Sequence, residues 1–195
     1  KSEKKKDGKF RIISTGSISV RKGSHYLLEA FDNLRLPNSE LIFIGDISDD
    51  FKQIKKKYSN MKNIKFIKKQ NQEKLKFFYN DSDLFILCSI EEGLAMVQAQ
   101  AMACGLPVIC TTNTGGSEII DDGINGYVIP IRNSEILMDK IKILYKDREK
   151  LQEMSKNAHI KANNQLSWKN YGEKMLDIYQ KLLQDKLISK KNLIN

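Results

Sequence analysis

The chain has 195 residues, of which 41% are apolar and 29% charged, so it can bury the core of one domain and is not disordered throughout. Its three cysteines, Cys88, Cys104 and Cys110, are unevenly spaced, which argues against a disulfide framework or a zinc module and favours a reducing compartment. No apolar run reaches the length that crosses a bilayer.

The chain begins KSEKKKDGKF, without an initiator methionine or the apolar stretch of a secretory signal. We therefore expect residues 1–9 to be a polar linker cut from a longer chain, and residues 10–188 to form the domain with its C-terminal helices. Residues 189–195 are expected to be a frayed tail. The expected location is the cytoplasm.

The net charge of +9 is concentrated in residues 52–76, which contain ten lysines and a single acidic residue, Glu73. A solvated lysine-rich face is the favoured interpretation. The alternative is attraction to an anionic membrane surface, where lipid-linked acceptors lie, so the protein could be peripheral to the inner face of the membrane. Nucleic acid is not an expected partner, because only Tyr58 and Phe66 interleave aromatic rings with these charges.

Short apolar runs alternate with segments of helical periodicity. In chain order, the pattern predicts a strand at 10–15, a helix at 25–34, a strand at 40–44, a helix at 51–58, a strand at 63–67, a helix at 73–79, a strand at 84–88, a helix at 95–103, and strands at 107–110 and 127–129. From residue 133 onward only helices are predicted. Two apolar stripes there are interpreted as core packing, one at Leu137, Ile141, Leu144 and Tyr145, and one at Trp168, Tyr171, Met175, Ile178 and Leu182.

Strands separated by helices imply right-handed crossovers and a parallel sheet, and strands without polar alternation imply that both faces of the sheet are covered. The predicted fold is therefore α/β, a Rossmann-like doubly wound parallel sheet with C-terminal helices. Ligands of such sheets bind beyond the carboxyl ends of the strands. Three candidate segments follow strands, at residues 16–23, 89–95 and 111–117.

The first two segments carry groups suited to a diphosphate. GSISVRKG, at residues 16–23, combines a glycine after a strand with Arg21 and Lys22, although a plain turn with solvated basic residues would look similar. In the second segment, Glu91 and Glu92 precede Gly93 and a helix whose amide groups favour phosphate oxygens, while a carboxylate accepts hydrogen bonds from sugar hydroxyls. The alternative is that one of these carboxylates only caps the helix.

The remaining polar features are interpreted structurally. The third segment, with its two adjacent glycines, is a glycine-rich loop. His25 and His159 are isolated in the sequence and are interpreted as structural or solvated. No cluster of ligands has metal spacing, so no metal site is expected.

The run EEGLAMVQAQAMACGLPVICTTNTGGSEIIDDGINGYVIP strongly resembles the donor-binding domain of retaining GT-B glycosyltransferases, the glycosyl transferases group 1 family. GSISVRKGSHYLLEAF, ELIFIG, NIKFI and SWKNYGEKMLDIY resemble it too, so the resemblance extends from residue 10 to about residue 183. It implies the second half of a GT-B fold, and an acceptor-binding N-terminal Rossmann domain of the same protein that this chain lacks.

The resemblance implies catalytic roles for Glu92, Lys22 and Arg21, with Arg21 taking the place of the family arginine that is Ser17 here. It implies a set of donor-binding residues: Gly16, Ser17, Ile67, Lys68, Glu91, Gly93, Leu94, Ala95, Met96, Val97 and Gln100. Among these, Ile67 and Lys68 are expected near the base. Gln100 stands where the family has a glutamate that holds the ribose, and an amide can bond the same hydroxyls without charge assistance.

The implied activity is transfer of a hexose-type sugar from a UDP- or GDP-linked donor to an acceptor hydroxyl with retention, in cell-envelope, capsule or other glycan synthesis. No cofactor or metal is implied, because cationic side chains and helix amide groups would neutralise the leaving diphosphate. The full-length protein is the expected enzyme, and this chain alone is expected to bind nucleotide weakly and to transfer nothing.

Two other functions stay open. A non-catalytic nucleotide-sugar-binding or regulatory module is favoured by the substitutions at Ser17 and Gln100. A related GT-B sugar-nucleotide epimerase or phosphorylase would share the fold, although no motif marks the lysine that a pyridoxal phosphate-dependent phosphorylase needs.

Overall fold

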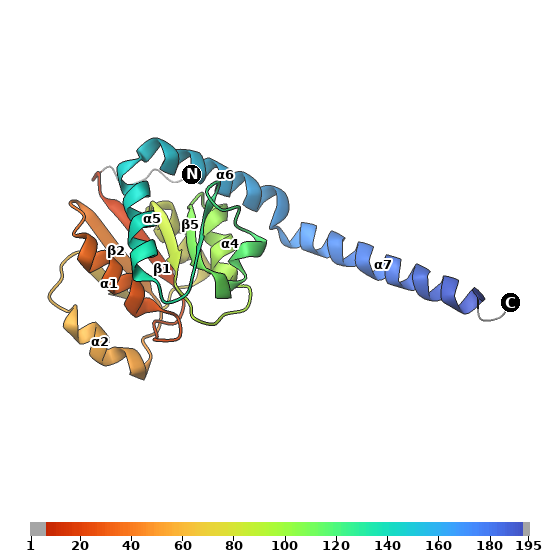
Figure 1. Cartoon of the computed structure of the whole chain (residues 1–195), viewed down its shortest axis with the longest axis horizontal. Coiled ribbons are helices and arrows are strands. Elements are labelled where there is room, and N and C mark those ends of the chain that lie inside the picture. The colour runs from red at the N-terminus through yellow and green to blue at the C-terminus, as the bar shows by residue number, and fades with distance from the viewer. Residues whose placement is uncertain (1–6, 193–195) are drawn as a thin grey trace.

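Six parallel strands form one sheet in the order β3-β2-β1-β4-β5-β6 in the computed structural model, which describes residues 7–192 (Figure 1). The strands are β1 (Phe10–Thr15), β2 (Ser39–Ile44), β3 (Ile64–Ile67), β4 (Leu84–Leu87), β5 (Val108–Thr111) and β6 (Gly126–Ile129). β1 and β4 are neighbours at the centre of the sheet, so the strand order reverses between them. The predicted doubly wound fold is confirmed, and each predicted strand boundary lies within one residue of the observed one.

Seven helices and three short 3-10 turns connect the strands and complete the described chain. The helices are α1 (Ser24–Leu34), α2 (Lys52–Lys57), α3 (Gln72–Asn80), α4 (Met96–Ala103), α5 (Ser134–Lys146), α6 (Arg148–Gln165) and α7 (Trp168–Asn192). The 3-10 turns are Asp49–Phe51, Thr112–Thr114 and Gly116–Glu118. The side chains of Asn71, Asn133 and Asp147 cap α3, α5 and α6, and each accepts a hydrogen bond from an amide in the first turn.

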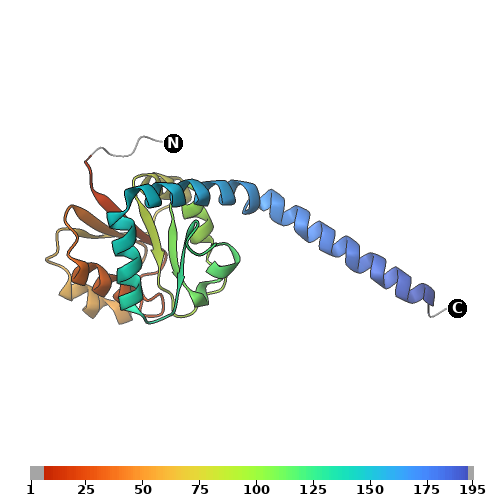
Figure 2. The ribbon, with the colours of Figure 1, turned by 45° about the horizontal axis from the view of Figure 1, so that its top comes forward.

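The sheet is apolar on both faces because successive side chains of a strand point in opposite directions. Ile12 packs into one core with α1 and α5, whereas Ile13, the next residue of β1, packs into the other with α3, α4 and α6. The stripe at Leu137, Ile141 and Leu144 lies in the first of these cores, as predicted. The two layers of helices leave the carboxyl edge of the sheet to the loops (Figure 2).

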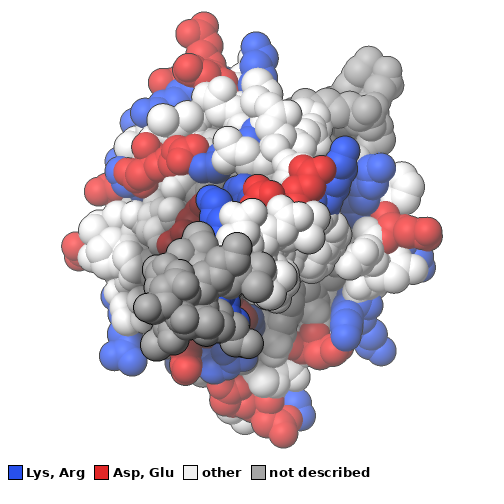
Figure 3. Space-filling view, turned by 90° about the vertical axis from the view of Figure 1, so that its right-hand side faces the viewer, with Lys and Arg blue, Asp and Glu red and all other residues white. Residues whose placement is uncertain are grey.

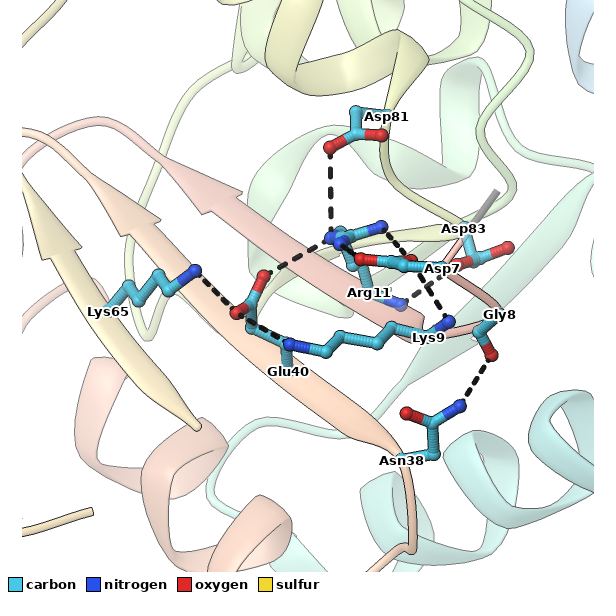
Figure 4. A network of polar contacts seen from close by, with 9 residues as sticks. All are labelled: Asp7, Gly8, Lys9, Arg11, Asn38, Glu40, Lys65, Asp81 and Asp83. Atoms are coloured by element: carbon cyan, nitrogen blue, oxygen red, sulfur yellow. Dashed lines mark hydrogen bonds and ion pairs between the residues drawn. The ribbon is translucent and has the colours of Figure 1, made fainter. Parts of the chain in front are cut away.

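A network of charged side chains lies at the opposite edge, where β1 and β2 begin (Figure 4). Arg11 and Glu40 are buried, and the Arg11 Nε donates a hydrogen bond to Glu40 Oε2 at 3.2 Å. Lys65 Nζ lies 2.6 Å from Glu40 Oε1, and the Arg11 guanidinium pairs with Asp7. The Arg11 amide donates to Asp83 Oδ2 at 2.8 Å. Residues just before β1, which were expected to be linker, are therefore held to the domain by Asp7.

The second predicted apolar stripe does not pack into a core. Helix α7 extends away from the sheet and its layers (Figures 1 and 2), and Trp168, Tyr171, Ile178 and Leu182 are exposed, while Met175 is half-buried. The prediction of core packing was wrong here, because the periodicity shows an apolar face but not what covers it. The expected frayed tail is helical through Asn192, and residues 193–195 lie outside the described part of the chain.

Positive and negative side chains are interspersed on the face from which α7 projects (Figure 3). The surplus of lysine in residues 52–76 belongs to α2, β3, α3 and their connections. Part of that charge is paired, since Lys52 lies 2.5 Å from Asp49, and Lys65 belongs to the network around Glu40.

Candidate functional site

Three loops meet at the carboxyl edge of the central strands. They follow β1, β4 and β5, and they correspond to the three candidate segments of the sequence. Because β1 and β4 are adjacent, the first two loops are neighbours at the point where the strand order reverses. All three candidate segments therefore lie at the same edge of the sheet.

The loops after β1 and β4 are fixed to one another through their backbones. The amide of Ile90 donates to the carbonyl of Arg21 at 2.9 Å, and the Arg21 guanidinium donates to the carbonyl of Glu91 at 3.0 Å. Gly23 has a φ of +62°, and a Cβ there would lie 1.9 Å from the carbonyl oxygen of Cys88. The close approach requires glycine at this position, and it holds the side chains of both loops in a common space.

Lys22 and Glu92 form an ion pair across these two loops. Their side chains are 16% and 20% exposed, so the pair is largely shielded from solvent. Burial, and secondarily the charge of Arg21, lowers the pKa of the Lys22 ammonium from its ordinary value. The Lys22 amide donates to Ser19 Oγ at 3.2 Å, which fixes the backbone from which the ammonium extends.

Helix α4 begins beside this pair, and its first turn is tied to the loop after β5. The amide of Ala95 donates to the carbonyl of Thr114 at 3.4 Å, and the buried side chain of Gln98 donates to the same carbonyl at 2.9 Å. Asn113 Nδ2 donates to the carbonyl of Ile90 at 3.0 Å, so the third loop braces the second. The positive end of the α4 dipole therefore lies at this edge of the sheet.

A pocket of about 410 Å³ opens next to the first loop. Its walls are Thr15, Gly16, Ser17, Ile44, Gly45, Asp46, Lys69, Gln70, Leu75 and Val97. Aliphatic side chains and glycines form much of this surface, and Asp46, Lys69 and Gln70 supply polar groups. Such a surface suits a flat heterocycle with polar edges.

The structure brings most of the predicted donor-binding residues to this edge. Gly16, Ser17 and Val97 line the pocket. Glu91, Gly93 and Leu94 are exposed on the segment that leads into α4, and Met96 is exposed at the first residue of the helix. Gln100 is half-buried on α4, one turn after Val97, so both residues lie on the same side of the helix.

Ile67 and Lys68, the residues expected near the base, are not among the residues that line this pocket. Ile67 ends β3 and accepts a hydrogen bond from the Gly45 amide through its carbonyl, and Lys68 is exposed. The pocket is lined instead by Lys69 and Gln70. These two residues and Asp46 were not among the predicted residues, although each follows a strand and could have been found from that position.

The cysteines and histidines are neither members of the ion pair nor lining residues of the pocket. All three thiols are free, and burial raises the pKa of Cys88 to about 12 and that of Cys110 to about 11, so both stay protonated at neutral pH. Burial also lowers the pKa of His25. His159 contacts the carbonyl of Ala103 at 2.7 Å through Nδ1. Within residues 7–192, no group of three or more His, Cys, Asp or Glu side chains could hold a metal ion.

The model of one protein family, glycosyl transferases group 1, matches residues 1–161. The chain belongs to this family. It is 30% identical over 189 residues to spore coat protein SA of Bacillus subtilis (strain 168), a match that covers 89% of this chain and 49% of that protein. It is 31% identical over 179 residues to the lipopolysaccharide 1,2-N-acetylglucosaminetransferase of Salmonella typhimurium, covering 84% and 46%. The chain therefore spans about half the length of these relatives.

Solved structures of other proteins have the same fold. The C-terminal domain of the group 1 family protein LpcC from Francisella tularensis superimposes with a TM-score of 0.76 at 24% identity, covering 83% of this chain and 88% of that one. Anabaena Alr3699/HepE in complex with UDP gives a TM-score of 0.81 at 22% identity, covering 89% and 49%. These likenesses confirm the expected second half of a GT-B fold. Across the described residues of this family member, no helix is long and apolar enough to cross a membrane.

Proposed function

We propose that the chain is the donor-binding half of a glycosyltransferase that moves a hexose-type sugar from a UDP- or GDP-linked donor to an acceptor hydroxyl with retention. The observation that carries this proposal is the pairing of Lys22 with Glu92 at the reversal of strand order, beside the start of α4. The likeness to HepE, which was solved with UDP and with UDP-glucose, supports a nucleotide-sugar ligand. Relatives named for lipopolysaccharide and capsular polysaccharide enzymes support a role in cell-envelope glycan synthesis.

Each part of the site has a task in this proposal. The pocket beside Val97 receives the nucleoside, with Gln100 near the ribose. Lys22 and the amide groups at the start of α4 face the diphosphate, whose negative charge grows as the sugar bond breaks. Glu92 accepts hydrogen bonds from the sugar hydroxyls. Cationic and dipolar groups of the chain thus do the work that a divalent metal does elsewhere, so the reaction is proposed to be metal-independent.

The acceptor is proposed to bind in the other half of the full-length protein, because the chain covers about half of its relatives. The chain alone is then expected to bind the nucleotide and to transfer nothing. This predicts sugar transfer only when the segment matching the rest of the relatives is supplied on the same polypeptide. Transfer by the 195-residue chain alone would contradict this division of tasks.

Calorimetric titration tests the diphosphate assignment. UDP and GDP are titrated into the wild type and into Lys22→Ala, and we expect the variant to bind the preferred nucleotide about tenfold more weakly or worse, because it loses the central cation. Lys169→Ala is the matched control, since it removes an exposed ammonium from α7, which extends away from the sheet (Figure 1). Equal affinity of Lys22→Ala and the wild type would show that the diphosphate binds elsewhere.

A non-catalytic nucleotide-sugar-binding module is the second candidate, and Gln100 is the observation that favours it. An amide at this position on α4 offers the ribose an uncharged partner and so weaker binding than a carboxylate gives. Assaying sugar transfer by the full-length protein, with Gln100 unchanged, discriminates the two candidates. A glycosyltransferase already shows transfer with Gln100, whereas a binding module shows none.

The lysine-rich residues 52–76 are proposed to bring the protein to the inner, anionic surface of the cytoplasmic membrane. Cosedimentation with vesicles of rising phosphatidylserine content tests this idea. The bound fraction is expected to rise with the anionic lipid and to fall with salt. A bound fraction that ignores lipid charge leaves the segment as a solvated face.

A further inference from the structure

The ion pair between Lys22 and Glu92 joins the loops that follow β1 and β4. It is held by a rigid frame, because the two loops share the hydrogen bond from Ile90 to Arg21 and the close contact of Gly23 with Cys88. The neighbouring acid Glu91 is exposed, so only one of the two adjacent carboxylates faces the ammonium. The cation proposed to hold the diphosphate is thus the same ammonium that Glu92 pairs with.

A diphosphate that binds here has to compete with a carboxylate for the same ammonium. Glu92 Oε2 is shielded from solvent, so water does not readily replace Lys22 as its partner. A nucleotide sugar can compensate the carboxylate for the loss of the Lys22 ammonium, because the sugar hydroxyls donate hydrogen bonds to it. A free nucleoside diphosphate has no such hydroxyls near its terminal phosphate.

The charges of the two ligands also favour the nucleotide sugar over the free nucleoside diphosphate. The terminal phosphate of a free nucleoside diphosphate can ionise a second time near neutral pH, whereas in a nucleotide sugar that oxygen is esterified. The free diphosphate therefore brings more negative charge towards the Glu92 carboxylate, in a site of reduced solvent screening. Glu92 disfavours this ligand twice, by holding its cation and by repelling its charge.

We propose that Glu92, through its ion pair with Lys22, selects the sugar-bearing donor over the spent nucleoside diphosphate. This inference rests on the proposed function, since it assigns the same site a preference between the substrate and the product of transfer. Its consequence is that the carboxylate promotes release of the product, in addition to contacting the sugar. The consequence distinguishes it from a residue that only contributes donor affinity.

Glu92→Gln tests this, because the amide keeps the shape and the hydrogen-bonding reach of the side chain but removes its charge. UDP, UDP-glucose, GDP and GDP-mannose are titrated calorimetrically into the wild type and the variant. We expect Glu92→Gln to bind the free nucleoside diphosphate about three- to fivefold more tightly than the wild type does. The nucleotide sugar is expected to bind no more tightly, so the ratio of the two affinities shifts towards the product.

Two controls separate this effect from a general loss of negative charge. Glu118→Gln removes an exposed carboxylate from the loop after β5, at the same edge of the sheet, and should leave the ratio unchanged. Lys22→Ala/Glu92→Gln is compared with Lys22→Ala, and Glu92→Gln with the wild type. The gain in diphosphate affinity should be smaller in the first comparison than in the second, because the two residues act as a pair. Far-ultraviolet circular dichroism verifies that each variant is folded.

The outcomes distinguish the inference from the function on which it rests. If the wild type binds nucleotides and Glu92→Gln binds the diphosphate equally or more weakly, the selection is refuted while the donor site stands. If neither the wild type nor the variants bind any of the four ligands, the proposed donor site fails and the inference fails with it.

Discussion

Arg11 and Glu40 are charged residues with almost no exposure, and each is satisfied by several partners from other elements. Removing one member of such a pair leaves a buried charge without compensation. We expect Arg11→Leu to lower the free energy of unfolding by about 3 kcal/mol, measured by urea denaturation. The exposed pair of Lys52 and Asp49 gives the comparison, and Lys52→Leu should change stability by less than about 1 kcal/mol.

The same network predicts how the stability of the protein depends on pH. Burial raises the pKa of Glu40, but the hydrogen bonds and charges of Lys65 and Arg11 outweigh it, so the pKa lies below its ordinary value. The folded state therefore binds the proton less readily than the unfolded chain, and this stabilisation is lost as the pH falls through the folded pKa. Between about pH 5 and pH 3, the stability of Glu40→Gln should fall less steeply than that of the wild type. Parallel pH profiles would show that Glu40 is not the responsible group.

The sequence predicted the edge of the sheet at which Lys22 and Glu92 lie, but it did not predict that the two side chains form an ion pair. Lys22 and Glu92 were both expected near the donor because each follows a strand, and parallel strands end on the same side. Their pairing depends on the path of two loops, which periodicity does not describe. Arg11 and Glu40 were missed altogether, since each lies in an apolar strand and their contact joins two strands far apart in the chain.

Gly45, directly after β2, allows the loop that follows β1 to pack closely against the end of β2. A Cβ at this position would lie 1.7 Å from the carbonyl oxygen of Gly16, in the loop that follows β1. We expect Gly45→Ala to lower the free energy of unfolding by about 2 kcal/mol and to weaken nucleotide binding, because the first loop must move away. Thermal unfolding and calorimetry measure the two effects.

Gly172 provides the matched control for that substitution. It lies on α7 with nothing within 4 Å of an added Cβ, so Gly172→Ala should leave stability unchanged or raise it by up to about 1 kcal/mol. If both variants lose the same stability, the contact between Gly45 and Gly16 is not what restricts the site.

The strands and most helices could be predicted because their apolar residues pack against the sheet and also carry the local pattern. Asn133 and Asp147, which cap α5 and α6, reinforce that pattern with their hydrogen bonds. The stripe on α7 has the same periodicity, yet Tyr171 and Leu182 are exposed. Periodicity reports an apolar face, and whether that face is covered depends on the rest of the molecule.

Across the whole molecule, α7 contributes little to the core that holds the sheet together. We expect removal of residues 168–195 to shift the thermal midpoint by less than about 3 °C, because most of the apolar side chains removed are exposed. A longer truncation that also removes α6 should unfold the protein, since Leu151, Met154 and Ala158 are buried. Circular dichroism measures both, and a large loss from the shorter truncation would show that α7 packs on the domain.

The chain has a single tryptophan, Trp168, and it lies at the first residue of α7 with 75% of its surface exposed. Indole emission follows the polarity around the ring, so the native protein should already emit at the long wavelengths of a hydrated fluorophore. Melting of the sheet or arrival of a nucleotide will leave that signal nearly flat. A blue shift would instead report that some surface has closed over the start of the projecting helix, which makes intrinsic fluorescence a selective probe of α7.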